Sequence, residues 1–188
     1  MPVQCDTVVT PGDWHTLYEA TRTNGTETLV VRHVPDHSNE YFYRTNVSVR
    51  DDVPVDDRSF RGHRLPAAEL MRPFAGSDFW LADLGLEFFH WPDQKVLKHE
   101  MRRGRECAVL ESTDPHPSPN GYSRVVSWID QETLGIVQAR AYDAKGRLLK
   151  EFYPKSFKKV RGQWEPQEME IINDQTGSRT WMRFDLQP

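Results

Sequence analysis

The sequence has little cysteine and no long apolar run. Its two cysteines, Cys5 and Cys107, are too few and too far apart to predict a metal site or a redox pair. A disulfide between them would require an oxidising compartment. No segment approaches the ~18 consecutive apolar residues of a membrane-spanning helix, and the first ten residues lack the charged start and apolar centre of a signal peptide. We therefore expect a soluble chain.

The segment at the first cysteine leaves one alternative open. Val3-Gln4-Cys5 resembles the end of a lipoprotein cleavage site, at which the cysteine would carry a lipid. However, Gln4 occupies the position of the expected small residue, and no apolar run precedes it. The pattern therefore does not decide whether Cys5 is lipidated.

An excess of positive charge is also missing. The chain has 24 basic and 28 acidic residues, which argues against nucleic acid as a partner because phosphate binding requires clustered Lys and Arg. Hydrophobic residues make up 37% of the chain, below the usual share of roughly 45–50%. Six Trp, nine Phe and six Tyr nevertheless supply a large apolar area. We expect a single domain, residues 1–188, with a thin or open core.

The sequence contains no recognisable catalytic or metal-binding motif. His33 and His37 are four residues apart, but a proline between them excludes the helix that would align both rings on a metal. Cys107 lies in a β-rich segment, where buried and inert thiols are common. Asp78 and Asp83 are interpreted as favourable charges near a helix N-terminus rather than as an acid–base pair. We therefore predict a non-enzymatic protein without catalytic residues, metal or cofactor.

The most apolar stretch is residues 76–92, GSDFWLADLGLEFFHWP. Ser77 or Asp78 can accept hydrogen bonds from the N–H groups of a first helical turn, and Pro92 cannot continue the helix. Apolar side chains fall on nearly all sides of such a helix, so the rest of the fold must cover it. We predict one helix here and a shorter one at residues 65–72.

Most of the remaining chain is predicted to form β-strands. Thr23-Asn24-Gly25-Thr26 between two extended runs indicates a hairpin, and turns at regular intervals after Pro92 indicate an antiparallel meander. The charged residues 50–64 are predicted to be an exposed loop. The result is an α+β fold, a curved antiparallel sheet with short helices against its concave face. The predicted strands are residues 14–22, 27–34, 40–49, 94–101, 106–112, 122–129, 134–143, 147–153, 156–160, 164–172 and 178–186.

Over residues 65–188, several short motifs resemble the outer-membrane lipoprotein-sorting family, which is related to periplasmic lipoprotein carriers of the LolA type. Gly76-Ser77-Asp78-Phe79 followed by Asp83-Leu84 is similar to the Gly-Ser/Thr-Asp-Phe…Asp-Leu element of that family. The other matching segments are Tyr122-Ser123-Arg124 with Trp128-Ile129-Asp130, Ala141-Tyr142-Asp143-Ala144-Lys145-Gly146, and Trp164-Glu165-Pro166 with Thr180. The order and spacing of these short motifs carry the resemblance.

The resemblance implies an incomplete β-barrel wrapped around a plug of short helices, with an apolar interior that accepts lipid acyl chains. It implies a carrier of lipids or lipidated proteins in the periplasm or cell envelope, with a membrane-associated donor or acceptor protein as partner. The sequence departs from the family pattern at its beginning, where the export signal, the long helix and the first strands are missing or shortened. We expect either a truncated N-terminal part or a divergent, smaller half-barrel.

Aromatic excess in the central stretch supports an apolar ligand. Each of its five large aromatic side chains would bury about 150–250 Å², more than one short helix against one sheet face conceals. The alternative is that these rings fill the core, and that the same fold serves as a protein-interaction or envelope-stress sensor domain. The residues predicted to bind lipid are Phe79, Trp80, Leu84, Phe88, Phe89, Trp91, Trp128 and Met182.

A basic cluster near the C-terminal strands is predicted to dock on an anionic membrane surface or an acidic partner. It consists of Lys155, Lys158, Lys159 and Arg161. The alternative is that these are ordinary solvated charges of a turn.

Overall fold

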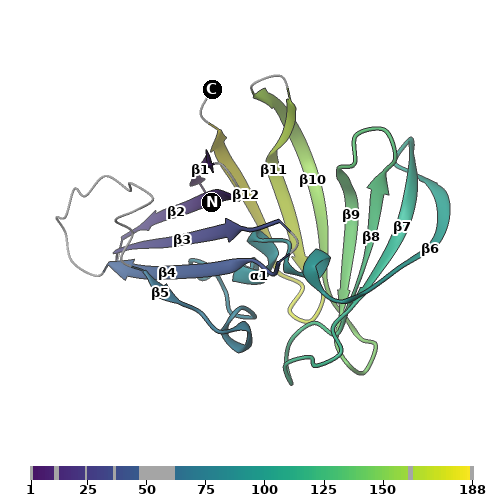
Figure 1. The fold of residues 1–188 in the computed structure, drawn as a ribbon, viewed down its shortest axis with the longest axis horizontal. Helices are drawn as coiled ribbons and strands as arrows, with labels where there is room; N and C mark the ends of the chain where they lie inside the picture. Colours follow the sequence, from purple (N-terminus) through teal and green to yellow (C-terminus); the bar gives the residue numbers. More distant parts are fainter. Residues whose placement is uncertain are drawn as a thin grey trace.

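The computed structural model describes residues 2–10, 13–23, 25–35, 37–46, 62–160 and 163–186. They form one curved, unclosed sheet of twelve strands with a short helical segment in its hollow (Figure 1). The strands are β1 (Pro2–Thr10), β2 (Asp13–Arg22), β3 (Gly25–His33), β4 (Glu40–Asn46), β5 (His63–Arg64), β6 (Asp93–Arg102), β7 (Arg105–Thr113), β8 (Arg124–Asp130), β9 (Ile136–Tyr142), β10 (Leu148–Val160), β11 (Gln163–Asn173) and β12 (Arg179–Leu186). The predicted α+β half-barrel is confirmed.

The sheet consists of two meanders joined along one pair of strands. Its order is β5-β4-β3-β2-β1-β12-β11-β10-β9-β8-β7-β6. All neighbours are antiparallel except β1 and β12, which pair in parallel, with Val3 opposite Phe184. Strand β1 was not predicted, and the expectation of a purely antiparallel sheet was wrong at this junction. On its other side β1 pairs antiparallel with β2, its neighbour in sequence, but β12 lies at the far end of the chain, so no hairpin signal marks the parallel pairing.

Local turn signals predicted most of the other strands correctly. The predicted first hairpin is confirmed, since Arg22 of β2 pairs with Gly25 of β3 across a two-residue loop. Residues 147–153 and 156–160, predicted as two strands, form the single strand β10, with a bulge from Pro154 to Ser156. Of the predicted charged loop, residues 50–61 lie outside the described residues, and β5 at its end pairs with β4.

The main hydrophobic core lies between the sheet and residues 65–92, which connect β5 to β6 and are here called the plug. Side chains of β12 alternate between this core and solvent, because successive residues of a strand point to opposite faces. Met182 and Phe184 are 0% and 6% exposed, whereas Trp181 is 55% exposed. A second, small cluster consists of Cys107, Val109, Val126 and Trp128.

The plug contains three short helices rather than the two predicted. They are η1 (Ala67–Glu69), α1 (Leu81–Leu84) and η2 (Glu87–His90). The single helix predicted for residues 76–92 is wrong, because the chain turns between α1 and η2, where Leu86 has a φ of 50°. The carbonyl oxygens of Leu84 and Gly85, which a continuous helix would use, instead accept hydrogen bonds from Tyr18 and Asn39 at 2.9 and 2.7 Å.

Gly85 is required at this break by the close approach of the sheet. A Cβ atom at Gly85 would lie 2.1 Å from the Tyr41 hydroxyl oxygen, so any larger residue would displace the plug or the ring.

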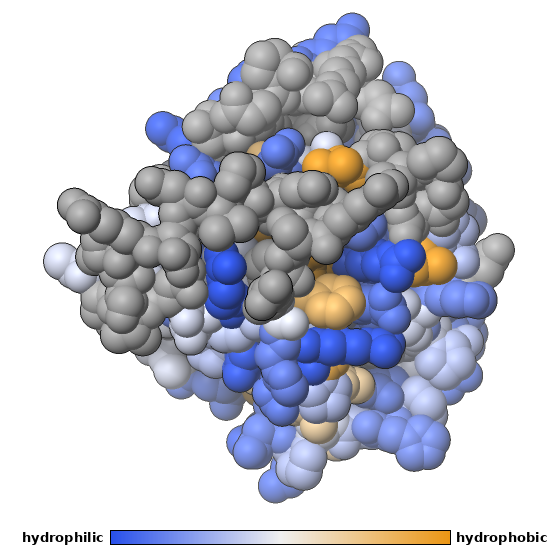
Figure 2. Space-filling view, turned by 60° about the vertical axis from the view of Figure 1, so that its left-hand side comes forward, coloured by the Kyte–Doolittle hydropathy of each residue, from blue (hydrophilic) through white to orange (hydrophobic). Residues whose placement is uncertain are grey.

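Within the described residues, no helix has both the length and the apolar character needed to cross a membrane. On the face shown in Figure 2, hydrophilic side chains surround a few separate hydrophobic ones.

Candidate functional site

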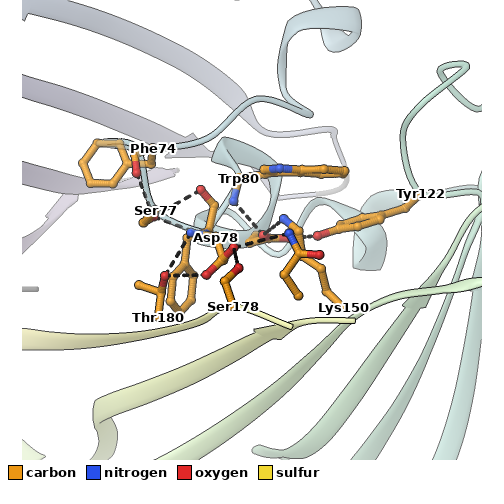
Figure 3. A network of polar contacts seen from close by, with 11 residues as sticks. Phe74, Ser77, Asp78, Trp80, Tyr122, Lys150, Ser178 and Thr180 are labelled. Carbon is orange, nitrogen blue, oxygen red and sulfur yellow. Dashed lines mark hydrogen bonds and ion pairs between the residues drawn. The ribbon is translucent and has the colours of Figure 1, made fainter. Parts of the chain in front are cut away.

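A buried ion pair fixes the plug to the sheet. Nζ of Lys150 on β10 lies 3.2 Å from Oδ2 of Asp83 on α1, and the Asp83 and Lys150 side chains are 0% and 1% exposed. The Asp83 carboxylate also accepts hydrogen bonds from the Tyr122 hydroxyl at 2.8 Å and the Trp80 N–H at 2.7 Å (Figure 3). These three contacts therefore converge on Asp83 from the plug and from two different segments of the C-terminal meander.

The surroundings of Lys150 are mostly apolar. Its Nζ lies 3.5 Å from the centroid of the Trp80 ring, which stacks on Tyr122 with a centroid distance of 4.7 Å. Burial lowers the pKa of Lys150 to about 8, and the Asp83 carboxylate opposes this fall. Burial also raises the pKa of Asp83, against the opposing charge of Lys150. Each charge is tolerated in the core because the other is present.

A second polar contact fastens the start of the plug to β12. Asp78 accepts hydrogen bonds of 2.7 Å from the hydroxyls of Thr180 and Ser178, and its N–H donates to the Thr180 hydroxyl at 3.0 Å (Figure 3). Burial acts to raise the pKa of Asp78, but the hydrogen bonds from Ser178 and Thr180 outweigh it and hold that pKa below its usual range.

The prediction that Ser77 or Asp78 caps a helix is therefore wrong. The Ser77 hydroxyl donates to the Phe74 carbonyl oxygen at 2.7 Å, and Trp80 occupies the N-cap position of α1. Asp83 acts as the capping carboxylate, because it accepts the Trp80 N–H from within the first turn. Its predicted role as a charge near the helix N-terminus is correct, but its pairing with Lys150 was not predicted.

Neutral side chains hold the other end of the plug to the N-terminal meander. The Tyr41 hydroxyl donates to Glu87 at 2.8 Å, beside the hydrogen bonds from Tyr18 and Asn39 to the plug backbone. Burial raises the pKa of Glu87 to about 7, and the hydrogen bonds from Tyr41 and Asn39 oppose this rise. Glu87 is thus a partly buried carboxyl that is stabilised by hydrogen bonds rather than by a cation.

An apolar cavity of about 370 Å³ opens between the plug and the sheet. Among its apolar lining residues are Leu84, Leu86 and Phe89 of the plug and Met169 and Phe184 of the sheet. The remaining lining residues are Cys5, Thr7, Thr16, Tyr18, Phe79, Asp83, Leu134, Gly135, Ile136, Pro154, Phe157 and Pro166. The lining is thus mostly apolar, and Asp83 is its charged member.

A second cavity of about 530 Å³ adjoins the first. The two share part of their lining, which includes Ile136 and Phe157. The second cavity is also lined by charged side chains, which are Arg103, Arg105, Asp130 and Glu132. An apolar cavity thus continues into one with charges of both signs.

The structure brings only some of the predicted lipid-binding residues to the apolar cavity. Phe79, Leu84 and Phe89 line it. Phe88 and Met182 are buried in the core at 2% and 0% exposure. The other three predicted residues lie elsewhere: Trp80 stacks on Tyr122, Trp91 packs against the core, and Trp128 lies in the separate small cluster.

Trp128 is far from the plug because its strand directs it to the opposite face of the sheet. Its indole N–H donates to Glu100 of β6 at 2.6 Å, and the Arg102 guanidinium lies over its ring at 4.8 Å. Sequence reasoning missed Leu86, Met169 and Phe184 as cavity residues. The alternation in β12 provided a signal for Phe184, whereas no local pattern marks Leu86.

The predicted docking residues lie on β10 and beyond it. Lys155 forms an ion pair with Glu170 at 2.5 Å, and its Nζ lies 5.4 Å from the centroid of the Trp181 ring. Lys158 is half-buried and Lys159 is exposed, while Arg161 lies outside the described residues. Lys155 and Lys159 are therefore the exposed members among the three described residues of the cluster.

The described residues contain no group of three or more His, Cys, Asp or Glu side chains that could hold a metal ion. No disulfide joins the two cysteines. Cys5 lines the apolar cavity, whereas Cys107 lies in the small cluster with Trp128.

Comparisons with known proteins agree with this architecture. A family model described as "Uncharacterized protein" matches residues 56–186. No curated protein sequence matches the chain. Among solved structures, a protein domain from Vibrio parahaemolyticus named for outer membrane lipoprotein sorting has a TM-score of 0.67 and 22% identity, over 95% of this chain and 73% of that one.

Two further structures have the same fold. A DUF1329 family protein from Desulfovibrio piger has a TM-score of 0.58 and 23% identity, over 90% of this chain and 74% of that one. A LolA superfamily protein from Nitrosomonas europaea has a TM-score of 0.57 and 16% identity, over 95% of this chain and 80% of that one. At these identities the comparisons establish a LolA-like fold.

Proposed function

The chain belongs to the family whose model matches residues 56–186 and has a LolA-like fold, and on this premise we propose that it is a non-enzymatic carrier of lipids or lipidated proteins in the bacterial cell envelope. Its mechanism is the reversible burial of acyl chains between the sheet and the plug. The observation that carries the proposal is the apolar cavity of about 370 Å³ beside Leu86 and Phe89. Such a volume falls within the roughly 300–1,000 Å³ of ligand pockets.

The lining of this cavity suits a hydrocarbon chain. Transfer of each methylene group from water contributes about 0.8 kcal/mol before the cost of ordering the ligand. The anchors at Asp83 and Asp78 hold the plug in place, so the cavity is present before the ligand arrives. The adjoining charged cavity suits the polar part of a lipid or the peptide part of a lipidated protein.

A filled core supports the alternative function of a protein-interaction or sensor domain. Phe88 and Met182 are almost completely buried, so part of the predicted lipid site is occupied by the protein itself. Native mass spectrometry after mild extraction separates the two functions, since a carrier should retain co-purifying lipid. A protein that remains empty and does not take up a fluorescent fatty acid would favour the sensor.

The cavity can be tested directly with a charge at its wall. Phe89→Arg is expected to reduce fatty-acid uptake by at least about tenfold, because an ion would replace an apolar wall. Phe88→Arg is less suitable, since Phe88 lies in the core and its replacement would also disturb folding. Val8→Arg is the matched control, because Val8 is exposed and does not line the cavity. Unchanged uptake by a folded Phe89→Arg variant would contradict the proposal.

A further inference from the structure

Strand β6 forms a long and accessible edge of the sheet. Within the described chain it pairs on one side only, with β7, and its residues are exposed or half-buried along its whole length. Three of its large apolar side chains, Val96, Leu97 and Met101, are 54%, 43% and 66% exposed. The opposite edge strand, β5, is only two residues long. The backbone groups and apolar side chains of β6 together are typical of a strand-pairing surface.

Two features of β6 nevertheless oppose pairing with an arbitrary strand. Lys95 and Lys98 place charges on the edge, and a bulge lies between Val96 and Lys98. Lysines and bulges are common means of preventing aggregation through sheet edges. A partner of β6 must therefore match both its charges and its bulge.

The strand itself meets this requirement when it runs antiparallel to a second copy. In the register centred between Leu97 and Lys98, Lys95 lies opposite Glu100 of the second copy, and Asp93 lies opposite Arg102. Two-fold symmetry repeats each contact, which gives four pairs of opposite charge in one ten-residue interface. Opposite charges on directly facing residues stabilise strand pairing.

The facing side chains also lie on the same side of the sheet. Asp93, Lys95, Glu100 and Arg102 pair with Thr113, Glu111, Cys107 and Arg105, which alternate along β7 and so share one face. Lys95 and Glu100 are five residues apart, an odd spacing that would place their side chains on opposite faces of a regular strand. The bulge between Val96 and Lys98 shifts the alternation by one residue, so both side chains lie on the same face. Because the bulge lies at the centre of the proposed register, each half of β6 keeps its side chains on the same face as the half of the second copy that it pairs with.

Glu100 is already held at this edge. Its carboxylate accepts the Trp128 indole N–H at 2.6 Å and lies 2.6 Å from Nζ of Lys98. A second Lys would therefore approach a carboxylate whose position is fixed, and little side-chain freedom would be lost on pairing.

We propose that β6 is a homodimerisation edge, through which two copies of this chain join their sheets in an antiparallel β6–β6 pair. The apolar cavity is lined by no residue of β6, so dimerisation leaves it accessible. The inference therefore does not depend on the proposed carrier function. The contact is a strand addition of modest area, and its affinity should depend on salt because facing charges contribute to it.

The oligomeric state tests the proposal. Analytical ultracentrifugation of the wild-type chain over a concentration series should show a monomer–dimer equilibrium that added salt weakens. Lys95→Glu and Asp93→Lys are expected to weaken dimerisation by about tenfold or more, because each replaces two attractive pairs with repulsive ones. Lys145→Glu is the matched control, since it makes the same charge change at an exposed turn residue and should leave the equilibrium unchanged.

A charge exchange identifies the register. Lys95→Glu mixed with Glu100→Lys should restore dimers, since Glu then faces Lys at both positions, whereas each variant alone should be monomeric. Thermal melts establish that each variant is folded, which matters for Glu100→Lys because it removes the hydrogen bond to Trp128. A wild-type chain that stays monomeric at its highest soluble concentration would overturn the proposal. So would dimers that persist in both Lys95→Glu and Asp93→Lys, or a β6 edge that binds extended peptides without self-association.

Discussion

The plug contacts the sheet in two different ways. On the anchored side, Asp83, Lys150 and Tyr122 are all buried, and the charged pair lies in close contact with aromatic rings. Farther along the plug, Leu86 and Phe89 line the cavity together with Asp83, but they are only half-buried and face an open apolar volume. Because the plug is firmly attached to the sheet through Asp83, its residues at the cavity can remain incompletely packed. Without the anchors, hydrophobic collapse of the plug onto the sheet would be expected to close the cavity.

Removal of the buried Lys150 cation should have the largest effect on the stability of the protein. Lys150→Met is expected to lower the free energy of unfolding by about 3–5 kcal/mol, because it leaves the Asp83 carboxylate buried without its counter-ion. Urea denaturation measures the change. The double variant Lys150→Met/Asp83→Asn should be more stable than Lys150→Met alone, since the amide is neutral. A cost below about 1 kcal/mol for the single variant would contradict the anchoring role.

Two leucines of the plug provide a matched test of the packing difference. Leu81 is 0% exposed in the core, whereas Leu86 is half-buried at the cavity. Leu81→Ala is expected to cost about 2–5 kcal/mol of unfolding free energy, as for other buried leucines. Leu86→Ala should cost clearly less, about 1 kcal/mol, because fewer contacts are lost. Equal costs in denaturant titrations would show that the cavity side is as well packed as the core.

The pH dependence of stability tests the burial of Glu87, the plug carboxyl that is stabilised by hydrogen bonds rather than by a cation. The Glu87 pKa is raised from 4.5 to about 7, so the folded state holds this proton more tightly than the unfolded state. Its contribution to stability is fully present below pH 4.5 and is lost as the pH rises through about 7. The full shift corresponds to at most about 3 kcal/mol.

Glu87→Gln should remove this part of the pH dependence. The stability of the wild-type chain relative to the variant is expected to fall between pH 4.5 and about 7 and to change little above that range. Glu132→Gln is the control, because the Glu132 side chain is 82% exposed. Parallel stability profiles for the wild-type chain and Glu87→Gln would show that burial does not perturb Glu87.

The smallest effect is expected at the predicted docking cluster, which is remote from the anchors. Charge reversal at Lys158 and Lys159 should weaken binding to anionic vesicles, because each Lys near such a surface contributes about 1 kcal/mol. Co-sedimentation with vesicles that contain an anionic phospholipid measures the loss, with Lys145→Glu as control. Binding that is the same in all variants would remove the basis for docking through this cluster.

The β-structure could be predicted to a large extent because its signals are local. The hairpin at Gly25 follows from the residues of its turn, and the half-buried character of β12 follows from the alternation around Met182. Strand β1 pairs antiparallel with its neighbour β2 and in parallel with β12, which lies more than 170 residues away in the sequence, and only the parallel pairing is remote along the chain. The parallel pairing leaves no short-range signal in the sequence, whereas the pairing with β2 is local and was missed.

The candidate site was predicted only in part. The apolar character of residues 76–92 correctly indicated a covered segment, and Phe79, Leu84 and Phe89 do line the cavity. Trp128 was wrongly grouped with them, since the face of a strand that meets the plug depends on register with its neighbours. That the chain forms a single domain, and that the cavity binds lipid, remain predictions.

The sequence by itself determined which segments are extended, where most turns lie, and that the central stretch must be covered. Only the tertiary structure decided how that stretch is shaped. Tyr18 and Asn39 take the carbonyl oxygens that would continue the helix, from positions 66 and 46 residues away along the chain. Lys150 reaches Asp83 across 67 residues. Local propensity cannot encode such contacts, because they exist only once distant strands have been brought together.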